Sequence, residues 1–190
     1  MEAISVAIPA SKSAVTDRER FTWLYDQHFH EIFSYCARRV PAQTAHDVVS
    51  DVFVVVWRRI DDVPPGAERA WLFGVARGVL ANTWRSESRR GNLVAKLRTL
   101  RSSTAVEIDL DLVASTEGVL VRRALARLRA GDQEILRLAA WEELTGPEMA
   151  IALDVSLSAV QQRFSRARKR LAKALADVAA NEDTARGVGR

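Results

Sequence analysis

The sequence predicts an all-α protein of two small helical domains joined by a flexible linker, the second a four-helix domain with a helix-turn-helix. Few residues break helices, since the 190 positions hold 5 prolines and 9 glycines. Apolar residues mostly recur every three or four positions, which is the period of one helix face. Residues 91–117 interrupt this pattern with serines, a threonine and an acidic stretch, a composition typical of a linker. We therefore expect domains at 16–90 and 118–178, followed by a loose tail at 179–190.

The composition excludes several classes of protein. A hydrophobic content of 48% can form a core without metals or disulfides. The single cysteine, Cys36, has no partner for an internal disulfide. The three histidines, His28, His30 and His46, do not form a metal-ligand cluster. We therefore expect no structural zinc, no other metal and no cofactor.

Membrane insertion and export are also not expected. The longest run without Asp, Glu, Lys or Arg is nine residues, from Ala3 to Ser11, whereas a membrane-spanning helix needs about 20 mostly apolar residues. The N-terminus lacks a basic start followed by an apolar block and a small-residue cleavage site. The expected location is the cytoplasm.

The charge is unevenly distributed along the chain. A net charge of +4 is too small to indicate a nucleic-acid partner by itself. Between Val155 and Ala176, however, there are six basic residues and no acidic one. Arg outnumbers Lys by 24 to 4, which suits bidentate phosphate or base contacts, although a GC-rich genome explains the same bias better.

The first domain is predicted to contain three helices, the first of which begins near Thr16 or Asp17. Either side chain can accept a hydrogen bond from the free amides of the opening turn. Pro41 stops this helix, because a proline has no backbone N–H to donate. The apolar stripe of the helix is expected to comprise Phe21, Tyr25, His28, Ile32 and Cys36.

The second helix contains a valine-rich segment that could be mistaken for a strand. The adjacent polar residues Ser50 and Asp51 break any two-residue alternation, so a helical face is the better interpretation. That face comprises Val48, Val49, Val52, Phe53 and Val56. A loop with two prolines and Gly66 follows, and the third helix is predicted from Glu68 to Ser88. Between Ala70 and Trp84 the only charged residue is Arg77, so most of this helix must be buried or docked.

The strongest single motif is a helix-turn-helix between Thr145 and Phe164. Ala150 is small where two helices must approach closely, and Asp154 stands at the turn. Asp is one of the few residues that tolerate the positive φ of such a turn, and Ser156 can cap the next helix. The buried stripe of that helix is expected to be Leu157, Val160, Phe164, Ala167 and Leu171.

The opposite face of this helix is polar and basic, with no carboxylate to repel phosphate. It comprises Ser158, Ala159, Gln161, Gln162, Ser165, Arg166 and Lys169. A helix fits the major groove of B-form DNA, where residues near its N-terminus reach base edges. The best candidates for base contacts are Gln161, Gln162 and Arg163. Phosphate contacts are expected from Arg166, Arg168, Lys169 and Arg170. The alternative is a solvated amphipathic helix within a bundle.

Three segments carry a resemblance to a known family. The first is Ala124–Leu171, which contains the helix-turn-helix and ends in Ser165–Leu171. The second is Ala45–Trp57, and the third is Ala70–Arg77, which is similar to an Ala-Trp-Leu-Phe-x-Ile-Ala-Arg signature. Together they resemble the small, two-domain extracytoplasmic-function (ECF) sigma factors of bacterial RNA polymerase. In that family the three segments read the −35 element, dock on the polymerase clamp, and bind and open the −10 element.

The resemblance implies site residues and partners. For the −35 reader the implied residues are Ser158, Ala159, Gln161, Gln162, Arg163, Arg166 and Lys169. For the −10 reader they are Arg77, Asn82, Trp84, Arg85, Arg89 and Arg90. For polymerase binding they are Asp47, Ser50, Asp51 and Phe53. The implied partners are core RNA polymerase, promoter DNA and an anti-sigma protein.

The chain departs from the family pattern at several places. Gln161 and Gln162 replace a typical Lys-Ser pair, which predicts a −35 preference with more weight on adenine. A Gly131-Asp132 pair is expected to cap the helix that would begin at Gln133. Trp71 is expected in the core, whereas Trp84 is equally suited to the core or to base stacking.

Two other classes of function compete with this interpretation. An enzyme is not expected, because the sequence has no Gly-rich phosphate loop, no recognisable pair of nucleophile and base, and no metal-ligand spacing. The remaining alternative is a stand-alone helix-turn-helix regulator with an N-terminal sensing or dimerising domain. Such a regulator would not need the polymerase-docking and DNA-melting segments of the first domain.

Overall fold

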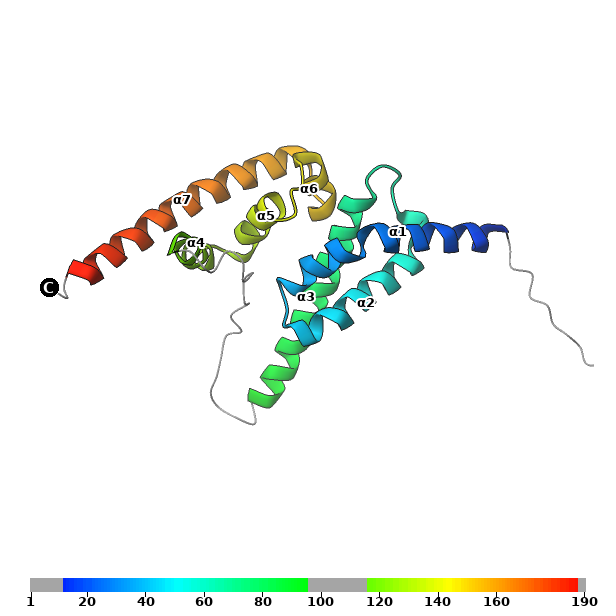
Figure 1. Ribbon diagram of the computed structural model, residues 1–190, viewed down its shortest axis with the longest axis horizontal. Helices are drawn as coiled ribbons and strands as arrows, with labels where there is room; N and C mark the ends of the chain where they lie inside the picture. Colours follow the sequence, from blue (N-terminus) through cyan, green and yellow to red (C-terminus); the bar gives the residue numbers. More distant parts are fainter. Residues whose placement is uncertain (1–11, 96–115, 188–190) are drawn as a thin grey trace, which may run out of the picture.

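The computed structural model describes residues 12–95 and 116–187, and it confirms the predicted all-α class (Figure 1). This part of the chain contains only helices and their connections. The elements are α1 (Lys12–Ala37), α2 (Ala42–Arg58), the short 3₁₀ helix η1 (Ile60–Asp62), α3 (Glu68–Ala95), α4 (Thr116–Ala126), α5 (Ala130–Ala140), α6 (Gly146–Leu153) and α7 (Leu157–Gly187). Within the described ranges, no helix is long and apolar enough to cross a membrane. Most of the predicted linker lies outside the described residues.

The first domain is formed by α1, α2 and α3, each of which packs against the other two. Its largest fully buried side chains are Leu24, Ile32, Tyr35, Val48, Val49, Val52, Val56, Leu72, Phe73 and Leu80. Helix α1 begins at Lys12, earlier than expected. The predicted stripe of α1 is confirmed at Ile32 and Cys36. It is wrong at Tyr25, which is 39% exposed, because the neighbouring Leu24 takes the inward position.

The helical interpretation of the valine-rich segment is confirmed. All five residues of its predicted face are buried in α2. Helix α3 begins at Glu68 as expected, but it continues to Ala95, past the predicted end at Ser88. Residues 89–95 contain no proline, and one glycine costs a helix only about 1 kcal/mol. The glycine at 91 therefore does not end the helix.

The second domain is formed by α4 to α7, with α7 packed along α4, α5 and α6. The helix-turn-helix has the predicted turn, since Asp154 ends α6 with φ 53°. The Ser156 hydroxyl accepts a hydrogen bond from the Ala159 amide at 3.3 Å. Helix α6 opens with a capping box, in which Thr145 and Glu148 each bond the backbone N–H of the other. Both helices of the motif therefore begin with a side-chain cap.

Three local expectations in this domain are wrong. Helix α5 begins at Ala130 with Arg129 at the N-cap, so Asp132 lies in the first turn instead of capping it. There the Asp132 carboxylate accepts a hydrogen bond from Arg170 at 2.6 Å. Leu157 is 42% exposed, because it lies over Gly146 at the start of α6 instead of over the core. Helix α7 continues to Gly187, through most of the tail expected to be loose.

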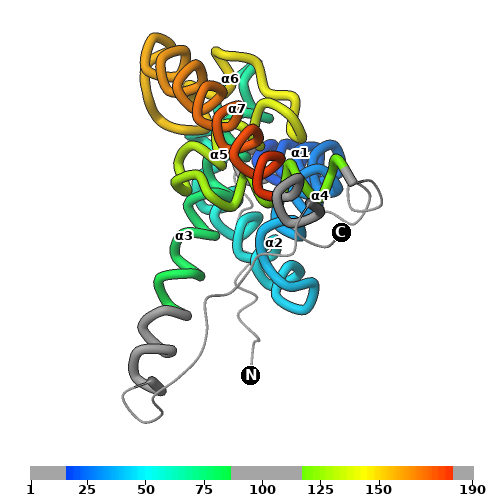
Figure 2. Tube along the Cα trace, turned by 90° about the vertical axis from the view of Figure 1, so that its left-hand side faces the viewer, coloured from blue at the N-terminus to red at the C-terminus, as the bar shows by residue number. Residues whose placement is uncertain are grey.

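The two domains pack directly against each other, with α6 beside the N-terminal half of α3 (Figures 1 and 2). Gly74 of α3 makes this approach possible. A Cβ atom at Gly74 would lie 3.4 Å from the carbonyl oxygen of Ala152 and 3.6 Å from its Cα. The backbones of the two helices are therefore in near contact.

Candidate nucleic-acid interface

One side of helix α7 is anchored in the core and fixes which side faces solvent. Val160, Ala167, Ala174 and Val178 are buried along the inner side. The predicted −35 residues lie on the other side. Ser158, Gln161, Gln162, Arg163, Arg166 and Lys169 are exposed, and Ala159 is half-buried. The structure thus brings the predicted set together on one face, with no carboxylate between Val155 and Ala176.

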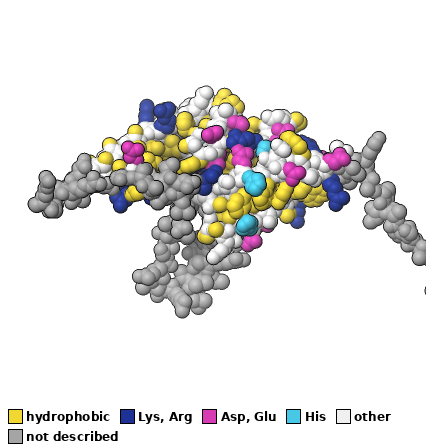
Figure 3. All heavy atoms as spheres, in the orientation of Figure 1, with side chains coloured by type: hydrophobic (Ala, Val, Ile, Leu, Met, Phe, Trp, Pro, Cys, Tyr) yellow, Lys and Arg dark blue, Asp and Glu magenta, His cyan; other side chains and the backbone are white. Residues whose placement is uncertain are grey.

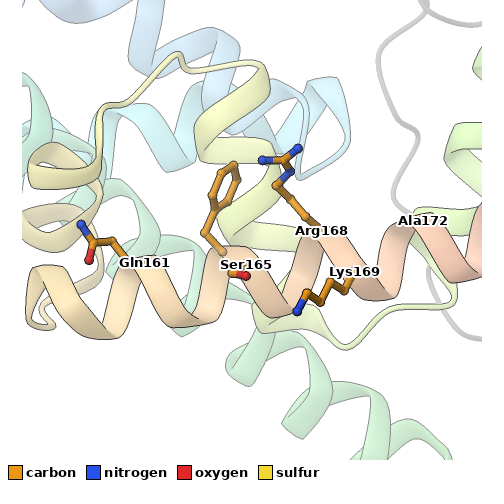
Figure 4. A pocket seen from close by; sticks show the side chains of 6 residues that line it. Gln161, Ser165, Arg168, Lys169 and Ala172 are labelled. Atoms are coloured by element: carbon orange, nitrogen blue, oxygen red, sulfur yellow. The ribbon is translucent and has the colours of Figure 1, made fainter.

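Two arrangements organise side chains on this face. The Arg166 Nε donates to the Gln162 carbonyl oxygen at 3.2 Å, and its Nη2 lies 3.4 Å from the Gln162 Oε1. Further along, a shallow cavity of about 500 Å³ is lined by Gln161, Phe164, Ser165, Arg168, Lys169 and Ala172 (Figure 4). The Arg168 guanidinium lies 5.9 Å from the centre of the Phe164 ring, within the range of a cation–π interaction.

The predicted −10 residues are divided between two environments. Asn82, Trp84 and Arg85 are exposed on α3, and Trp84 is 41% exposed. Arg85 donates to the Asn82 side-chain oxygen at 2.5 Å. Arg77 instead faces the second domain, where its Nε donates to the Ala152 carbonyl oxygen at 3.3 Å. Arg89 and Arg90 lie in α3, but their side chains are outside the described residues.

The loop before α3 is held by local contacts. Gly66 adopts φ +77°, and its amide donates to the Glu68 carboxylate at 2.9 Å. Arg20 of α1 donates to the Val63 carbonyl oxygen at 2.6 Å. The Arg59 guanidinium lies 5.4 Å from the centre of the Trp71 ring, and this tryptophan packs against the core as expected.

The outer face of α2 contains the predicted polymerase-binding residues, with one exception. Asp47, Ser50 and Asp51 are exposed. Phe53 is 4% exposed, since Phe21, Tyr25 and Phe29 of α1 cover it with ring centres 4.7–6.2 Å away. The Phe53 side chain therefore packs between α2 and α1, beneath the exposed residues of this face.

Sequence reasoning missed two exposed apolar residues on α2. Val54 and Trp57 are both 47% exposed, and Trp57 meets Phe21 edge to face at 5.3 Å. Hydrophobic side chains form a band over α1 and α2 in Figure 3. The spacing could have predicted the exposure of Val54, because this residue follows Ser50 by four positions and so lies on the same side of the helix.

A cluster of four charged residues joins the domains. We call Arg38 and Arg39 of the first domain, with Glu134 and Glu142 of the second, the interdomain ion cluster. Arg39 donates to Glu142 at 3.1 Å and to Glu134 at 3.2 Å, and Arg38 pairs with Glu142. Arg39 and Glu142 are each only 2% exposed. The Tyr35 hydroxyl donates to Glu134 at 2.7 Å, and the Arg39 guanidinium stacks 3.6 Å above the Tyr35 ring.

Burial and the neighbouring charges together shift the pKa values in this cluster. It raises the pKa of the Glu142 carboxyl, while Arg39 and Arg38 oppose that shift. Burial and the adjacent Glu134 raise the pKa of the Tyr35 hydroxyl well above its usual range, so this group remains a donor. Burial alone would lower the pKa of Arg39, but the acidic groups around it raise that pKa overall. The cluster is thus held together by complementary partners from opposite domains.

Arg69 at the start of α3 contacts residues of both domains. Its guanidinium pairs with Glu31 of α1, donates to the Glu142 carbonyl oxygen at 2.5 Å and lies 3.6 Å from the Glu148 carboxylate. Burial would raise the pKa of Glu31, but hydrogen bonds from His28 and Arg69 lower it overall. No signal in the sequence indicated these pairings.

Comparisons with known proteins agree with the two-part organisation. Residues 24–90 match the family model for sigma-70 region 2, and residues 119–171 match that for sigma-70 region 4. The RNA polymerase sigma factor CnrH of Cupriavidus metallidurans is 31% identical over 144 residues, which cover 72% of this chain and 75% of CnrH. The ECF RNA polymerase sigma factor SigL of Mycobacterium tuberculosis is 28% identical over 158 residues, 81% of this chain and 88% of SigL.

A solved structure has the same fold. The structure of CnrH in complex with the cytosolic domain of CnrY aligns with a TM-score of 0.58 and 27% identity. The alignment covers 88% of this chain and 95% of that one.

Proposed function

Because the chain belongs to the ECF group of the sigma-70 family of RNA polymerase sigma factors, we propose that it reads two promoter elements with its two domains. It is a promoter-recognising sigma factor, so the core polymerase performs the chemistry. In our proposal α7 binds the −35 element, while α3 and the loop before it bind and open the −10 element. The two reading units correspond to residues 16–90 and 118–178.

The observation that carries the proposal is the exposed, carboxylate-free face of α7. Gln161, Gln162 and Arg163 lie in the first two turns of the helix and are exposed, where they can reach base edges in the major groove. Arg166 and Lys169 lie further along the same face, and they would contact phosphates. Helix α6 would cross the DNA backbone, as the first helix of such motifs does.

The −10 element would be bound by the exposed part of α3. Trp84 can stack on an unpaired base, while Arg85 and Asn82 can contact the strand beside it. Arg89 and Arg90 would extend this surface along the same helix. Arg77 could join only after the domains separate, because α6 now holds it.

The outer face of α2 would dock on the polymerase. Asp47, Ser50 and Asp51 supply polar groups, and Val54 and Trp57 supply apolar area. Interfaces commonly combine a few aromatic anchors with a polar rim. Phe53 would contribute indirectly, because its packing against α1 fixes the position of α2.

An anti-sigma protein is a further proposed partner. CnrH, which this chain resembles along most of its length, was solved in complex with the cytosolic domain of CnrY. Since the polymerase is cytoplasmic, we place this chain there too. No cofactor is needed for any of these interactions.

A transcription assay with core polymerase and a promoter library tests the function. We expect initiation from templates that core polymerase alone ignores. Changing Gln162→Ala should alter the base preference within the −35 element and leave the −10 preference unchanged, because only α7 is affected. Failure to co-elute with core polymerase, together with tight binding to duplex DNA alone, would favour the stand-alone regulator instead.

A further inference from the structure

Helix α7 presents two adjacent glutamines to solvent, and a neighbour binds only one of them. Gln161 and Gln162 are both exposed. Arg166, one turn further along, bonds Gln162 at two points, because its Nε donates to the backbone carbonyl oxygen at 3.2 Å and its Nη2 to the side-chain Oε1 at 3.4 Å. In the described part of the chain, the Gln161 side chain has no hydrogen-bond partner. An arginine-bonded amide and a free amide therefore lie side by side.

The arginine determines which end of the Gln162 amide stays free. A guanidinium has N–H donors and no acceptor, so the amide must turn its oxygen towards Arg166 and its NH₂ group away. The N–H groups of an arginine form a rigid planar fork. Here the fork spans the backbone carbonyl and the side-chain oxygen of one residue. Gln162 is thereby oriented as a hydrogen-bond donor.

A free glutamine and an oriented one suit different bases. In the major groove adenine presents its N7 acceptor beside its N6 amino donor, so a glutamine that binds both must use its NH₂ group and its oxygen. Guanine presents two acceptors, N7 and O6. An NH₂ group carries two hydrogens, so it can donate to both guanine atoms without help from the amide oxygen.

Adenine is a poor match for the oriented Gln162 amide. The adenine amino group would have to share the Gln162 oxygen with the Arg166 guanidinium, which places two donors and a positive charge around one acceptor. If the amino group found no acceptor, its lost hydrogen bond would cost free energy once water has left the interface. No carboxylate between Val155 and Ala176 could accept in its place.

We propose that Arg166 is a positioning residue that makes Gln162 a reader of guanine in the −35 element, whereas the free Gln161 reads adenine. The inference rests on the proposed function and deepens it, because it assigns a different base to each of two neighbouring glutamines. Residue type alone gives both glutamines the same preference for adenine. Arg166 thus contributes to the choice of base, beyond any contact with phosphate.

The bond between Arg166 and Gln162 can be tested in the full-length chain without DNA. Arg163 is a suitable reference, because it is exposed on the same helix and its side chain has no hydrogen-bond partner among the described residues. We expect the Nε–H hydrogen of Arg166 to exchange with water several-fold more slowly than that of Arg163. NMR measures both rates, and the variants Arg166→Lys and Arg163→Lys assign the two signals. Equal rates would show that Arg166 is not bonded in solution and would overturn the proposal.

The choice of base is tested by promoter selection with the holoenzyme, formed from the full-length chain and core polymerase. The library is randomised within the −35 element. We expect Gln162→Ala to abolish a guanine preference at one position and so to identify that position. Arg166→Met keeps a side chain of similar length but has no donor, so it should lower the guanine-to-adenine ratio there by about tenfold. The position read by Gln161 should be unaffected.

Lys169→Met is the matched control for the lost charge. It removes a positive charge from the same exposed face and leaves the bond between Arg166 and Gln162 in place. It should weaken binding to all −35 sequences by the same factor and change no base ratio, as expected for a phosphate contact.

Two results of the selection would overturn the proposal. One is a preference for adenine at the Gln162 position in the unsubstituted chain. The other is an Arg166→Met variant that behaves like Lys169→Met, since Arg166 would then contact phosphate alone. In both cases selection of a −35 element persists, so the proposed function stands. If the unsubstituted holoenzyme selects no −35 sequence at all, the proposed function fails and the base assignment fails with it.

Discussion

Asp154 occupies a backbone conformation that few residues tolerate. Its φ of 53° lies in the left-handed region, at the turn between α6 and α7. A side chain in this region costs roughly 1–2 kcal/mol, less for Asp than for most residues and nothing for Gly. We expect Asp154→Gly to keep or slightly raise the free energy of unfolding, and Asp154→Ala to lower it by about 1 kcal/mol. Urea unfolding of the two variants measures the difference, and equal stabilities would contradict this account.

Glu148 shows how one residue makes the second domain sensitive to acid. Hydrogen bonds from the Thr145 side chain and backbone lower the pKa of this carboxyl below its ordinary 4.5. A lowered pKa in the folded state means that the stabilisation is present above the unfolded value, about 4.3, and is lost as the pH falls through the folded value.

The pH dependence of Glu148→Ala tests this reasoning. At pH 7 the variant should unfold at lower urea than the unsubstituted chain, because the capping box and the contact with Arg69 are lost. The gap should narrow as the pH falls below about 4, where the unsubstituted chain also loses its carboxylate. A gap that stays constant from pH 7 to pH 3 would mean that the ionised form of Glu148 contributes nothing.

At the scale of elements, α2 combines a buried valine face with an exposed face that suits a partner. Trp57 is 47% exposed and is supported from beneath by Phe21. An aromatic anchor of this kind often contributes 2 kcal/mol or more to an interface. We expect Trp57→Ala to weaken binding to core polymerase by about tenfold or more, measured by fluorescence anisotropy of the labelled chain. The matched control is Trp23→Ala on α1, where a tryptophan with 52% exposure has its ring against His28 of the same helix. Similar losses in both variants would argue against α2 as the docking face.

Local patterns predicted those features of the elements that depend on neighbours in the sequence. The valine face of α2, the left-handed Asp154 and the cap at Ser156 each follow from residues within one or two helical turns. The same reasoning failed where a segment distant in the sequence determines whether a side chain is buried or exposed. Phe53 fits an exposed docking motif by position, but three rings from α1 cover it. Leu157 fits the inner stripe of α7, but it lies over the start of α6.

At the scale of the whole molecule, the domain contact could not be predicted from the sequence. Tyr35 and Glu134 are separated by 99 residues, and Arg39 and Glu142 by 103. Individually these are common residue types in amphipathic helices, and no local spacing indicates that they meet. The near absence of charge between Ala70 and Trp84 of α3 did predict a buried or docked helix. The docking partner of its Gly74 side is α6 of the chain's own second domain.

Substitutions of Gly74 test the contact between α3 and α6 through the size of the side chain alone. In the middle of a helix, alanine is favoured over glycine by about 1 kcal/mol. An alanine Cβ would lie 3.4 Å from the Ala152 oxygen, an ordinary van der Waals contact. Gly74→Ala should therefore raise the melting temperature and leave the chain closed. Gly74→Leu places three more carbons where the Ala152 backbone lies, so α6 must move away and the domains should open.

Small-angle X-ray scattering distinguishes these outcomes, because separation of the domains increases the radius of gyration. We expect Gly74→Ala to scatter like the unsubstituted chain and Gly74→Leu to be more extended, with its helix content by circular dichroism unchanged. Since leucine is a good helix former, an open Gly74→Leu with intact helices would show that steric pressure at one point is enough to separate the domains. If Gly74→Leu stays as compact as Gly74→Ala, then α3 and α6 do not touch closely in solution, and the hydrogen bond between Arg77 and α6 loses its physical basis.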